Sequence, residues 1–226
     1  MRRKAALMCL LAITLWVAAA RPAGANPPRC KCQEGTSQDV SLLVDTDRCK
    51  LVVFADREPY RQYPVAVGRP ESPTPVGYFQ VVRKARDWGA GFGSRFLELN
   101  VPWGTYGIHG TNKPWTIGSY ASQGCIRMHN RDVEEIFPWV AEGTPVVIIG
   151  NPFTYRHPPF RELRRDFCGS DVMEVQRTLQ RLGLFGGQVD GTWRHDMEES
   201  VYRFRAQNGL SRDNVIDEAA YRALGF

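Results

Sequence analysis

Cys125 and His109 are the two side chains in this 226-residue chain best suited to nucleophilic chemistry. A thiol attacks an amide only as its thiolate, and an unperturbed cysteine, with a pKa of about 8.5, is mostly protonated near neutral pH. It therefore needs a base or a positive neighbour, and an imidazole supplies both roles. Taken alone, each residue has a simpler explanation, Cys125 as a small buried hydrophobe and His109 as a core histidine.

The sequence around the pair favours the catalytic explanation. Two motifs surround it, Ile-His-Gly-Thr at 108–111 and Ser-Gln-Gly-Cys-Ile-Arg-Met at 122–128. We expect the amides near Gly124 and Cys125 to stabilise a tetrahedral oxyanion. Ser122 is expected among the residues that bind the oxyanion or the substrate. Gly124 and Gly110 are expected to let the backbone approach the substrate. Arg127 suits recognition of a carboxylate or support of the thiolate, and its simpler role is an ion pair with the acidic helix start that follows.

These motifs resemble those of the L,D-transpeptidase catalytic domain of the YkuD type, in which a His-Gly pair precedes a Ser-His-Gly-Cys-Ile-Arg segment. The resemblance covers residues 40–150 and includes Thr-Pro-Val-Gly-Tyr-Phe at 74–79, Asn-Arg-Asp-Val-Glu at 130–134 and Gly-Thr-Pro-Val at 143–146. It implies that the first histidine, His109, activates Cys125. Gln123 stands where the family most often has a second histidine, and an amide there can donate a hydrogen bond but cannot titrate.

The resemblance implies an exported enzyme of the peptidoglycan, and hence of cell wall organisation and cell shape, with no cofactor or metal. Cys125 would attack the amide between the L-centre of diaminopimelate and the terminal D-Ala of a tetrapeptide stem, and an acceptor amine would resolve the thioester. A diaminopimelate acceptor gives a 3-3 cross-link, and water gives L,D-carboxypeptidase activity. Carbapenems are implied as ligands. The alternatives are a catalytically inactive wall-binding protein and a secreted metal-binding protein.

The C-terminal residues 169–226 resemble a three-helix peptidoglycan-binding domain. The matching segments are Val-Gln-Arg-Thr-Leu-Gln at 175–180, Leu-Gly-Leu-Phe at 182–185, Asp-Gly-Thr-Trp at 190–193, Phe-Arg at 204–205, where Phe-Gln is more usual, and Gly-Leu at 209–210. Apolar residues recur with a helical period and predict three helices, at 171–183, 197–209 and 217–225. Trp193 and Tyr202 are candidates to line a glycan or stem-peptide groove, with core packing expected for at least one. The domain's expected role is to hold the enzyme on an insoluble polymer.

Residues 40–150 have the apolar alternation of strands, with Val40, Leu42 and Val44 as the first example. The pattern predicts strands at 40–45, 50–55, 60–67, 77–82, 96–99 and 145–149, the first three antiparallel, and one helix capped by Asn130. We therefore expect a mainly β catalytic domain, a β-sandwich of the L,D-transpeptidase type with a short helix, and a small all-α domain. The Pro- and Arg-rich segment 151–168 is predicted to be a linker.

The first 25 residues have the form of a secretory signal peptide. Basic residues 2–4 precede an apolar run at 5–20, and Ala-Gly-Ala at 23–25 offers a cleavage site before Asn26. A retained membrane anchor is the alternative. Removing the four basic residues of this segment leaves 25 basic against 24 acidic residues, which argues against nucleic acid as a partner. We expect a monomer in the periplasm or cell wall with no membrane span after cleavage.

Export changes the chemistry expected of the cysteines, which after cleavage are Cys30, Cys32, Cys49, Cys125 and Cys168. An odd number in an oxidising compartment predicts a free thiol, which the motif assigns to Cys125, and two disulfides. A bridge between Cys30 and Cys32, in segment 26–39, would be strained, so each is expected to pair with Cys49 or Cys168. A structural zinc site from these four thiols is the competing interpretation. The remaining histidines, His129, His157 and His195, are expected at the surface.

Overall fold

The computed structural model of the chain describes residues 39–153 and 160–226. The predicted signal peptide, Cys30, Cys32 and His157 lie outside the described residues. Residues Gln38–Phe226 form one compact unit. Within the described ranges no helix is long and apolar enough to cross a membrane.

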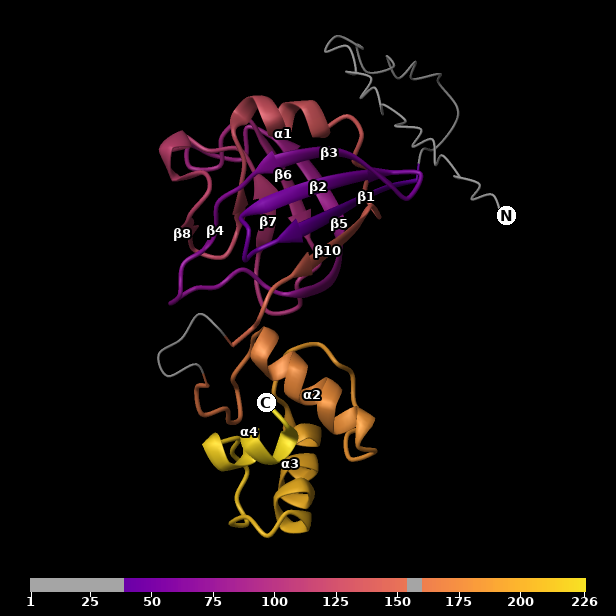
Figure 1. Cartoon of the computed structure of the whole chain (residues 1–226), viewed down its shortest axis with the longest axis vertical. Helices are drawn as coiled ribbons and strands as arrows, with labels where there is room; N and C mark the ends of the chain where they lie inside the picture. The colour runs from indigo at the N-terminus through magenta and orange to yellow at the C-terminus, as the bar shows by residue number, and fades with distance from the viewer. Residues whose placement is uncertain (1–38, 154–159) are drawn as a thin grey trace, which may run out of the picture. The chain divides into compact units, whose positions relative to one another are not determined.

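An eight-stranded sheet curls around the core of the N-terminal domain (Figure 1). In spatial order its strands are β3 (Glu58–Pro64), β2 (Lys50–Ala55), β1 (Val40–Asp45), β10 (Pro145–Ile149), β5 (Gly77–Arg86), β6 (Arg95–Leu99), β7 (Tyr106–His109) and β9 (Ile126–Arg127). A second, two-stranded sheet pairs β4 (Val67–Gly68) with β8 (Tyr120–Ser122). The mainly β domain expected from the sequence is therefore present.

Alternation of apolar residues explains which face of each strand is buried. Val40, Leu42 and Val44 of β1 point into the core, whereas Tyr78 of β5 is 81% exposed between buried neighbours. The antiparallel pairing of β1 with β2 and of β2 with β3 is confirmed. The pairing of β1 with β10 is parallel, and it joins segments about a hundred residues apart that local patterning does not connect.

One short helix, α1 (Asn130–Ile136), follows β9 and places Val133 and Ile136 in the core. Its N-cap residue is His129, which makes no side-chain capping bond. The predicted cap by Asn130 is therefore wrong by one position, and the Asn130 side chain points instead to the turn after His109, where its amide oxygen accepts hydrogen bonds.

The C-terminal domain contains the three predicted helices, α2 (Ser170–Arg181), α3 (His195–Gln207) and α4 (Glu218–Leu224). Together they surround a second core, to which Val175, Val201 and Tyr221 belong. Trp193 is 1% exposed within that core, so it packs rather than lines a groove, whereas Tyr202 is 40% exposed. Leu182, counted in the helical pattern, is 54% exposed because α2 ends one residue before it.

The described part of the segment predicted as a linker packs onto the helical domain. Leu163 is fully buried in the second core and forms an isolated β-bridge with Ile216. The hydroxyl of Tyr221 donates to the carbonyl oxygen of Arg161 at 3.0 Å. Residues 160–168 are therefore a structured part of this domain.

Candidate active site

Parallel pairing of β7 with β9 brings the nucleophile and base motifs together. Ile108 pairs with Ile126 and His109 pairs with Arg127. Because side chains alternate along a strand, the two isoleucines, both fully buried, fill the core, and His109 and Arg127 share the other face. Cys125 immediately precedes Ile126, and its thiol lies near the backbone N–H of Gly107 and the guanidinium of Arg127.

Burial, one contact with the backbone and one charge define the surroundings of the Cys125 thiol. Burial raises its pKa, while the backbone N–H of Gly107 and the guanidinium of Arg127 act in the opposite direction. The net effect keeps the thiol protonated at neutral pH. Its conversion to a nucleophile then depends on a base that removes the proton as the substrate is attacked.

His109 is placed and kept neutral by the interior of the domain. Its ring is 2% exposed and lies against Phe92 and Phe96, with ring centroids 5.0 and 5.8 Å away. Burial lowers its pKa to about 4, Arg127 adds to this effect, and the carbonyl groups of Gly110 and Phe92 oppose it. Nδ1 lies 2.5 Å from the carbonyl oxygen of Gly110. A neutral imidazole held in this way can accept a proton.

Ser122 fixes the loop that carries Cys125. Its buried hydroxyl donates to the carbonyl oxygen of Cys125 at 2.5 Å and accepts from the Gly124 N–H at 3.0 Å. Gly124 has φ of +109°, and a Cβ there would lie 2.6 Å from the Tyr106 ring, so a side chain is excluded. The Gly124 amide predicted to bind an oxyanion is thus already engaged. The Cys125 amide makes no hydrogen bond to a described residue and is the remaining donor.

Asn130 is the positioning residue that the sequence analysis missed. Its amide oxygen accepts from the N–H of Thr111 at 3.0 Å and from that of Ser94 at 3.3 Å. These bonds hold the Gly110–Thr111 turn against the start of α1 and thereby fix the carbonyl that contacts His109. The segment 130–134 was part of the family resemblance, but only the three-dimensional structure shows what the asparagine does.

Arg127 lies near Cys125 and is half-buried. Its Nη1 donates to the carbonyl oxygen of Ala121 at 3.3 Å, and its buried Nε has no hydrogen-bond partner among the described residues. No side-chain ion pair links it to the acidic residues of α1 in the described part of the chain. A guanidinium with unused donors next to a nucleophile is suited to an anionic substrate group.

Comparison with known proteins assigns this arrangement. Residues 39–148 match the family model of the YkuD L,D-transpeptidase catalytic domain, and residues 168–224 match that of a peptidoglycan binding domain. The L,D-transpeptidase YqjB of Bacillus subtilis (strain 168) is 33% identical over 154 residues, which cover 62% of this chain and 83% of that protein. The chain belongs to the L,D-transpeptidase family.

Other L,D-transpeptidases are similar over shorter stretches. YkuD of Bacillus subtilis (strain 168) is 47% identical over 88 residues, which cover 39% of this chain and 52% of that relative, so the chain spans about half of its length. The solved L,D-transpeptidase from Mycobacterium smegmatis is 22% identical, with a TM-score of 0.44, over 50% of this chain and 59% of that one. The catalytic domain of the Enterococcus faecium enzyme is 25% identical, with a TM-score of 0.43, over 50% and 98%.

The family's second histidine position is solvent-exposed in this L,D-transpeptidase. Gln123 is exposed, and its backbone carbonyl accepts a hydrogen bond from the Ser72 hydroxyl at 3.0 Å. His129 is half-buried and His195 lies at the surface near Glu198. None of these three side chains is among the causes of the pKa shifts of Cys125 and His109.

The other cysteines of the described residues are free thiols. Cys49 is buried, with its thiol 3.7 Å from the Thr46 carbonyl oxygen, and Cys168 is exposed. Their expected disulfide partners, Cys30 and Cys32, lie outside the described residues. The structure therefore contains neither expected bridge of Cys49 or Cys168, and the disulfide framework stays a prediction. Within 39–153 and 160–226, no group of three or more His, Cys, Asp and Glu side chains is arranged to hold a metal ion.

Proposed function

We propose that the chain is an exported cysteine L,D-transpeptidase acting on peptidoglycan tetrapeptide stems through a Cys125 thioester. The observation that carries this proposal is the pairing of β7 with β9, which sets His109 opposite Arg127, whose guanidinium also lies near the Cys125 thiol. The neutral imidazole supplies a base, and the peptidoglycan-binding domain supports peptidoglycan as the partner. Family membership supports the reaction class, and the periplasm or cell wall is where such a substrate is found.

The first half-reaction transfers the stem to sulfur. His109 Nε2 takes the thiol proton as Cys125 Sγ bonds to the carbonyl carbon at the L-centre of diaminopimelate. The oxyanion that forms accepts a hydrogen bond from the Cys125 N–H. Collapse breaks the carbon–nitrogen bond to D-Ala, His109 returns the proton to the departing amine, and a thioester remains.

The second half-reaction regenerates the thiol. An acceptor amine attacks the thioester carbonyl, His109 takes the amine proton, and the carbon–sulfur bond breaks to leave thiolate, which recovers the proton. A diaminopimelate amine yields a 3-3 cross-link, and another amine is attached in the same way. Water as the acceptor yields the free tripeptide acid, which is the carboxypeptidase alternative.

Mass measurement of the protein and its products tests this proposal. After incubation with tetrapeptide muropeptides, the full chain is expected to gain the mass of an acylated stem, and the products should include cross-linked dimers. The Cys125→Ala variant should show neither. Tripeptide without dimers would assign carboxypeptidase activity instead. A folded, unaltered protein that forms no adduct and releases no D-Ala would identify an inactive wall-binding protein.

A further inference from the structure

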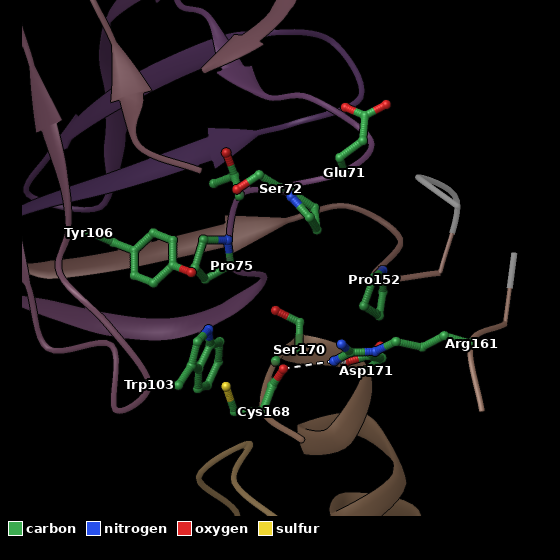
Figure 2. Close-up of a pocket in the computed structure, with 13 residues that line it drawn as sticks. Glu71, Ser72, Pro75, Trp103, Tyr106, Pro152, Arg161, Cys168, Ser170 and Asp171 are labelled. Atoms are coloured by element: carbon green, nitrogen blue, oxygen red, sulfur yellow. Dashed lines mark hydrogen bonds and ion pairs between the residues drawn. The ribbon is translucent and has the colours of Figure 1, made fainter. Parts of the chain in front are cut away.

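A polar pocket of about 180 Å³ lies next to the loop that carries Cys125 (Figure 2). The side chains that matter for its chemistry are Ser72, Trp103 and Tyr106 from the transpeptidase domain and Arg161, Cys168 and Ser170 from the helical domain. Two contacts join it to the nucleophile loop. The Ser72 hydroxyl donates to the Gln123 carbonyl oxygen at 3.0 Å, and the Tyr106 ring packs against Gly124.

Hydrogen bonds and close packing fasten the two walls of the pocket. The Val76 N–H donates to Ser170 Oγ at 2.8 Å across the domains. The indole of Trp103 lies directly over Gly191, where a Cβ would come within 2.4 Å of it. Within the helical wall, Arg161 forms two bonds to the Asp171 carboxylate, at 2.6 and 2.9 Å. These contacts therefore hold the two walls of the pocket in place against each other.

Several donors in the pocket are unused, and its size limits what they can bind. Ser170 accepts from Val76 but donates to no described residue, and Nη1 of Arg161 makes no hydrogen bond to one. Donors of this kind recognise carbonyl or carboxylate oxygens. The volume is below the roughly 300 Å³ of drug-sized sites and close to the about 150 Å³ that holds one small organic group. It suits a single peptide residue.

We propose that this pocket binds one residue of a peptidoglycan peptide stem and that the helical domain thereby completes the substrate groove of the transpeptidase domain. The inference rests on the proposed function, because the stem is the substrate of that reaction. It gives the helical domain a role beyond holding the enzyme on the polymer. The donor stem and the acceptor stem both carry carbonyl and carboxylate groups that the pocket could bind. Measuring thioester formation and amine transfer separately shows which of the two stems occupies it.

Cys168→Trp in the full chain tests the proposal. Cys168 is exposed, and Figure 2 shows its thiol beside Trp103, so an indole there fills the pocket. With tetrapeptide as donor, kcat/KM for thioester formation should fall about tenfold or more if the donor stem occupies the pocket. If the acceptor stem does, thioester formation should persist and transfer to the amine should fall. Acylation of Cys125 by a carbapenem, which is much smaller than a stem, should stay within about twofold.

Leu182→Trp is the matched control, because it adds the same indole at an exposed position. Leu182 follows the 12-residue helix α2, about 18 Å along its axis from Ser170. This variant should react as the unaltered protein does. Cys168→Leu should lower the rate of the affected half-reaction less than Cys168→Trp does. It replaces Cys168→Trp as the test if the indole prevents folding.

Two results would contradict the proposal that this pocket binds a stem residue. One is a folded Cys168→Trp protein that matches the unaltered protein in both half-reactions. The other is an equal loss of carbapenem acylation, which would show that the change reaches Cys125 itself. Failure of the unaltered protein to form any thioester would instead refute the proposed function, so the two failures are distinguishable.

Discussion

The Nδ1 atom of His109 lies 2.5 Å from the carbonyl oxygen of Gly110, the next residue in the chain. Because a carbonyl oxygen only accepts hydrogen bonds, this contact places the imidazole proton on Nδ1 and leaves Nε2 to take a proton. The carbonyl group of Phe92 is a second backbone acceptor near the ring. The orienting group of this base is thus a backbone carbonyl, which a substitution at Gly110 would displace but could not delete.

The pH dependence of acylation should report the lowered pKa of His109. With that pKa at about 4, the base is already neutral through the range in which an ordinary histidine titrates. Acylation of Cys125 by a carbapenem should therefore fall only as the pH drops below about 4, tenfold per unit. The rate constant followed by protein mass spectrometry checks this. A descending limb centred near the unperturbed value of about 6.5 would contradict it.

His109→Ala should remove that limb and slow acylation by about 10²- to 10⁴-fold, the usual contribution of a general base. The His129→Ala variant is its control, because that side chain makes no capping bond and does not contribute to the pKa shift of Cys125. It should leave the rate within about twofold. Equal rates for the two variants would exclude His109 as the base.

Asn130→Ala should slow catalysis without removing any reacting group. The change deletes the acceptor for the N–H groups of Thr111 and Ser94, so the turn that orients His109 loosens. Misplacement of a base by about 1 Å can cost on the order of 100-fold, and we expect a fall in kcat of about 10- to 100-fold with little change in KM. Steady-state kinetics with tetrapeptide measures both.

Asn130→Asp keeps an oxygen acceptor at the same place and should recover most of the rate. Asn112→Ala removes an exposed side chain that donates a 3.1 Å hydrogen bond to the Ala90 carbonyl oxygen, and it should be neutral. If alanine and aspartate at position 130 are equally slow, the acceptor role is wrong.

Local sequence patterns were enough to predict the longer strands and the helices. Alternation at Val40, Leu42 and Val44 and the helical period ending at Gly183 each reflect burial of one face, which neighbouring residues determine. Cys125 and His109 could be proposed as the reacting residues because each lies in a motif that is contiguous in the chain.

Contacts between distant segments were not predictable in the same way. Asn130 looks like a helix cap locally, and its bond to Ser94 joins residues 36 positions apart. Trp193 could equally have been a surface aromatic, and only the packed second core shows that it is 1% exposed. Short strands such as β9, with two residues, are too short to show an alternation of apolar and polar residues in the sequence. These features depend on tertiary packing.

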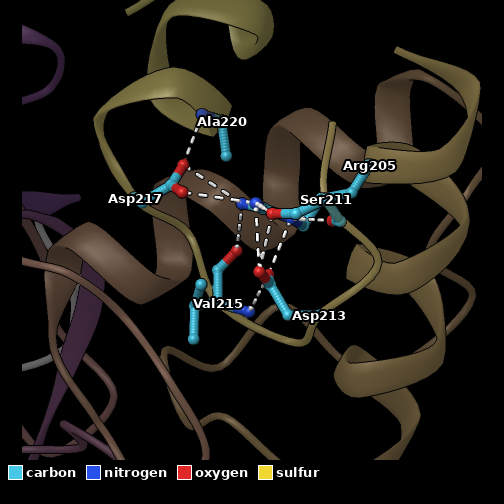
Figure 3. A network of polar contacts seen from close by, with 6 residues as sticks. All are labelled: Arg205, Ser211, Asp213, Val215, Asp217 and Ala220. Atoms are coloured by element: carbon cyan, nitrogen blue, oxygen red, sulfur yellow. Dashed lines mark hydrogen bonds and ion pairs between the residues drawn. The ribbon is translucent and has the colours of Figure 1, made fainter. Parts of the chain in front are cut away.

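Arg205 should be a major determinant of the stability of the helical domain. It is 1% exposed, and its guanidinium bonds to the Ser211 and Val215 carbonyl oxygens at 2.8 and 3.0 Å (Figure 3). It also pairs with Asp213 and Asp217, at 2.8 and 3.1 Å. Arg205→Gln removes the guanidinium from the two carbonyl oxygens and the two carboxylates. Because the carboxylates are 43% and 36% exposed and keep bonds from Ser211 and Ala220, we expect a loss of about 1–3 kcal/mol, the cost of leaving buried acceptors unsatisfied. Urea unfolding of the full chain measures the loss.

The control and the pH dependence follow from neighbouring charges. Arg203→Gln breaks an exposed contact with Glu199 and one exposed hydrogen bond to the Leu184 carbonyl oxygen, and it should cost about 1 kcal/mol or less. Burial raises the pKa of Asp217, but hydrogen bonds from Arg205 and from the Ala220 N–H outweigh it and lower the pKa overall. Asp217 therefore stabilises the fold above the unfolded pKa of about 3.9 and ceases to do so as the pH falls through the folded value. An Arg205→Gln protein as stable as Arg203→Gln would refute this account.

Binding to intact cell wall should depend on Tyr202. This side chain of α3 is 40% exposed, whereas Trp193, the other aromatic candidate of the domain, is buried, so Tyr202 is the one of the two that can stack on a sugar or peptide face. In a Cys125→Ala background, which removes covalent capture, Tyr202→Ala should lower the fraction that pellets with purified sacculi by about threefold or more. Tyr78→Ala, at an 81% exposed position of β5, removes a comparable ring from the transpeptidase domain and should pellet as before. Equal pelleting of the two variants would mean that the wall is bound through another face of the helical domain or through the transpeptidase groove.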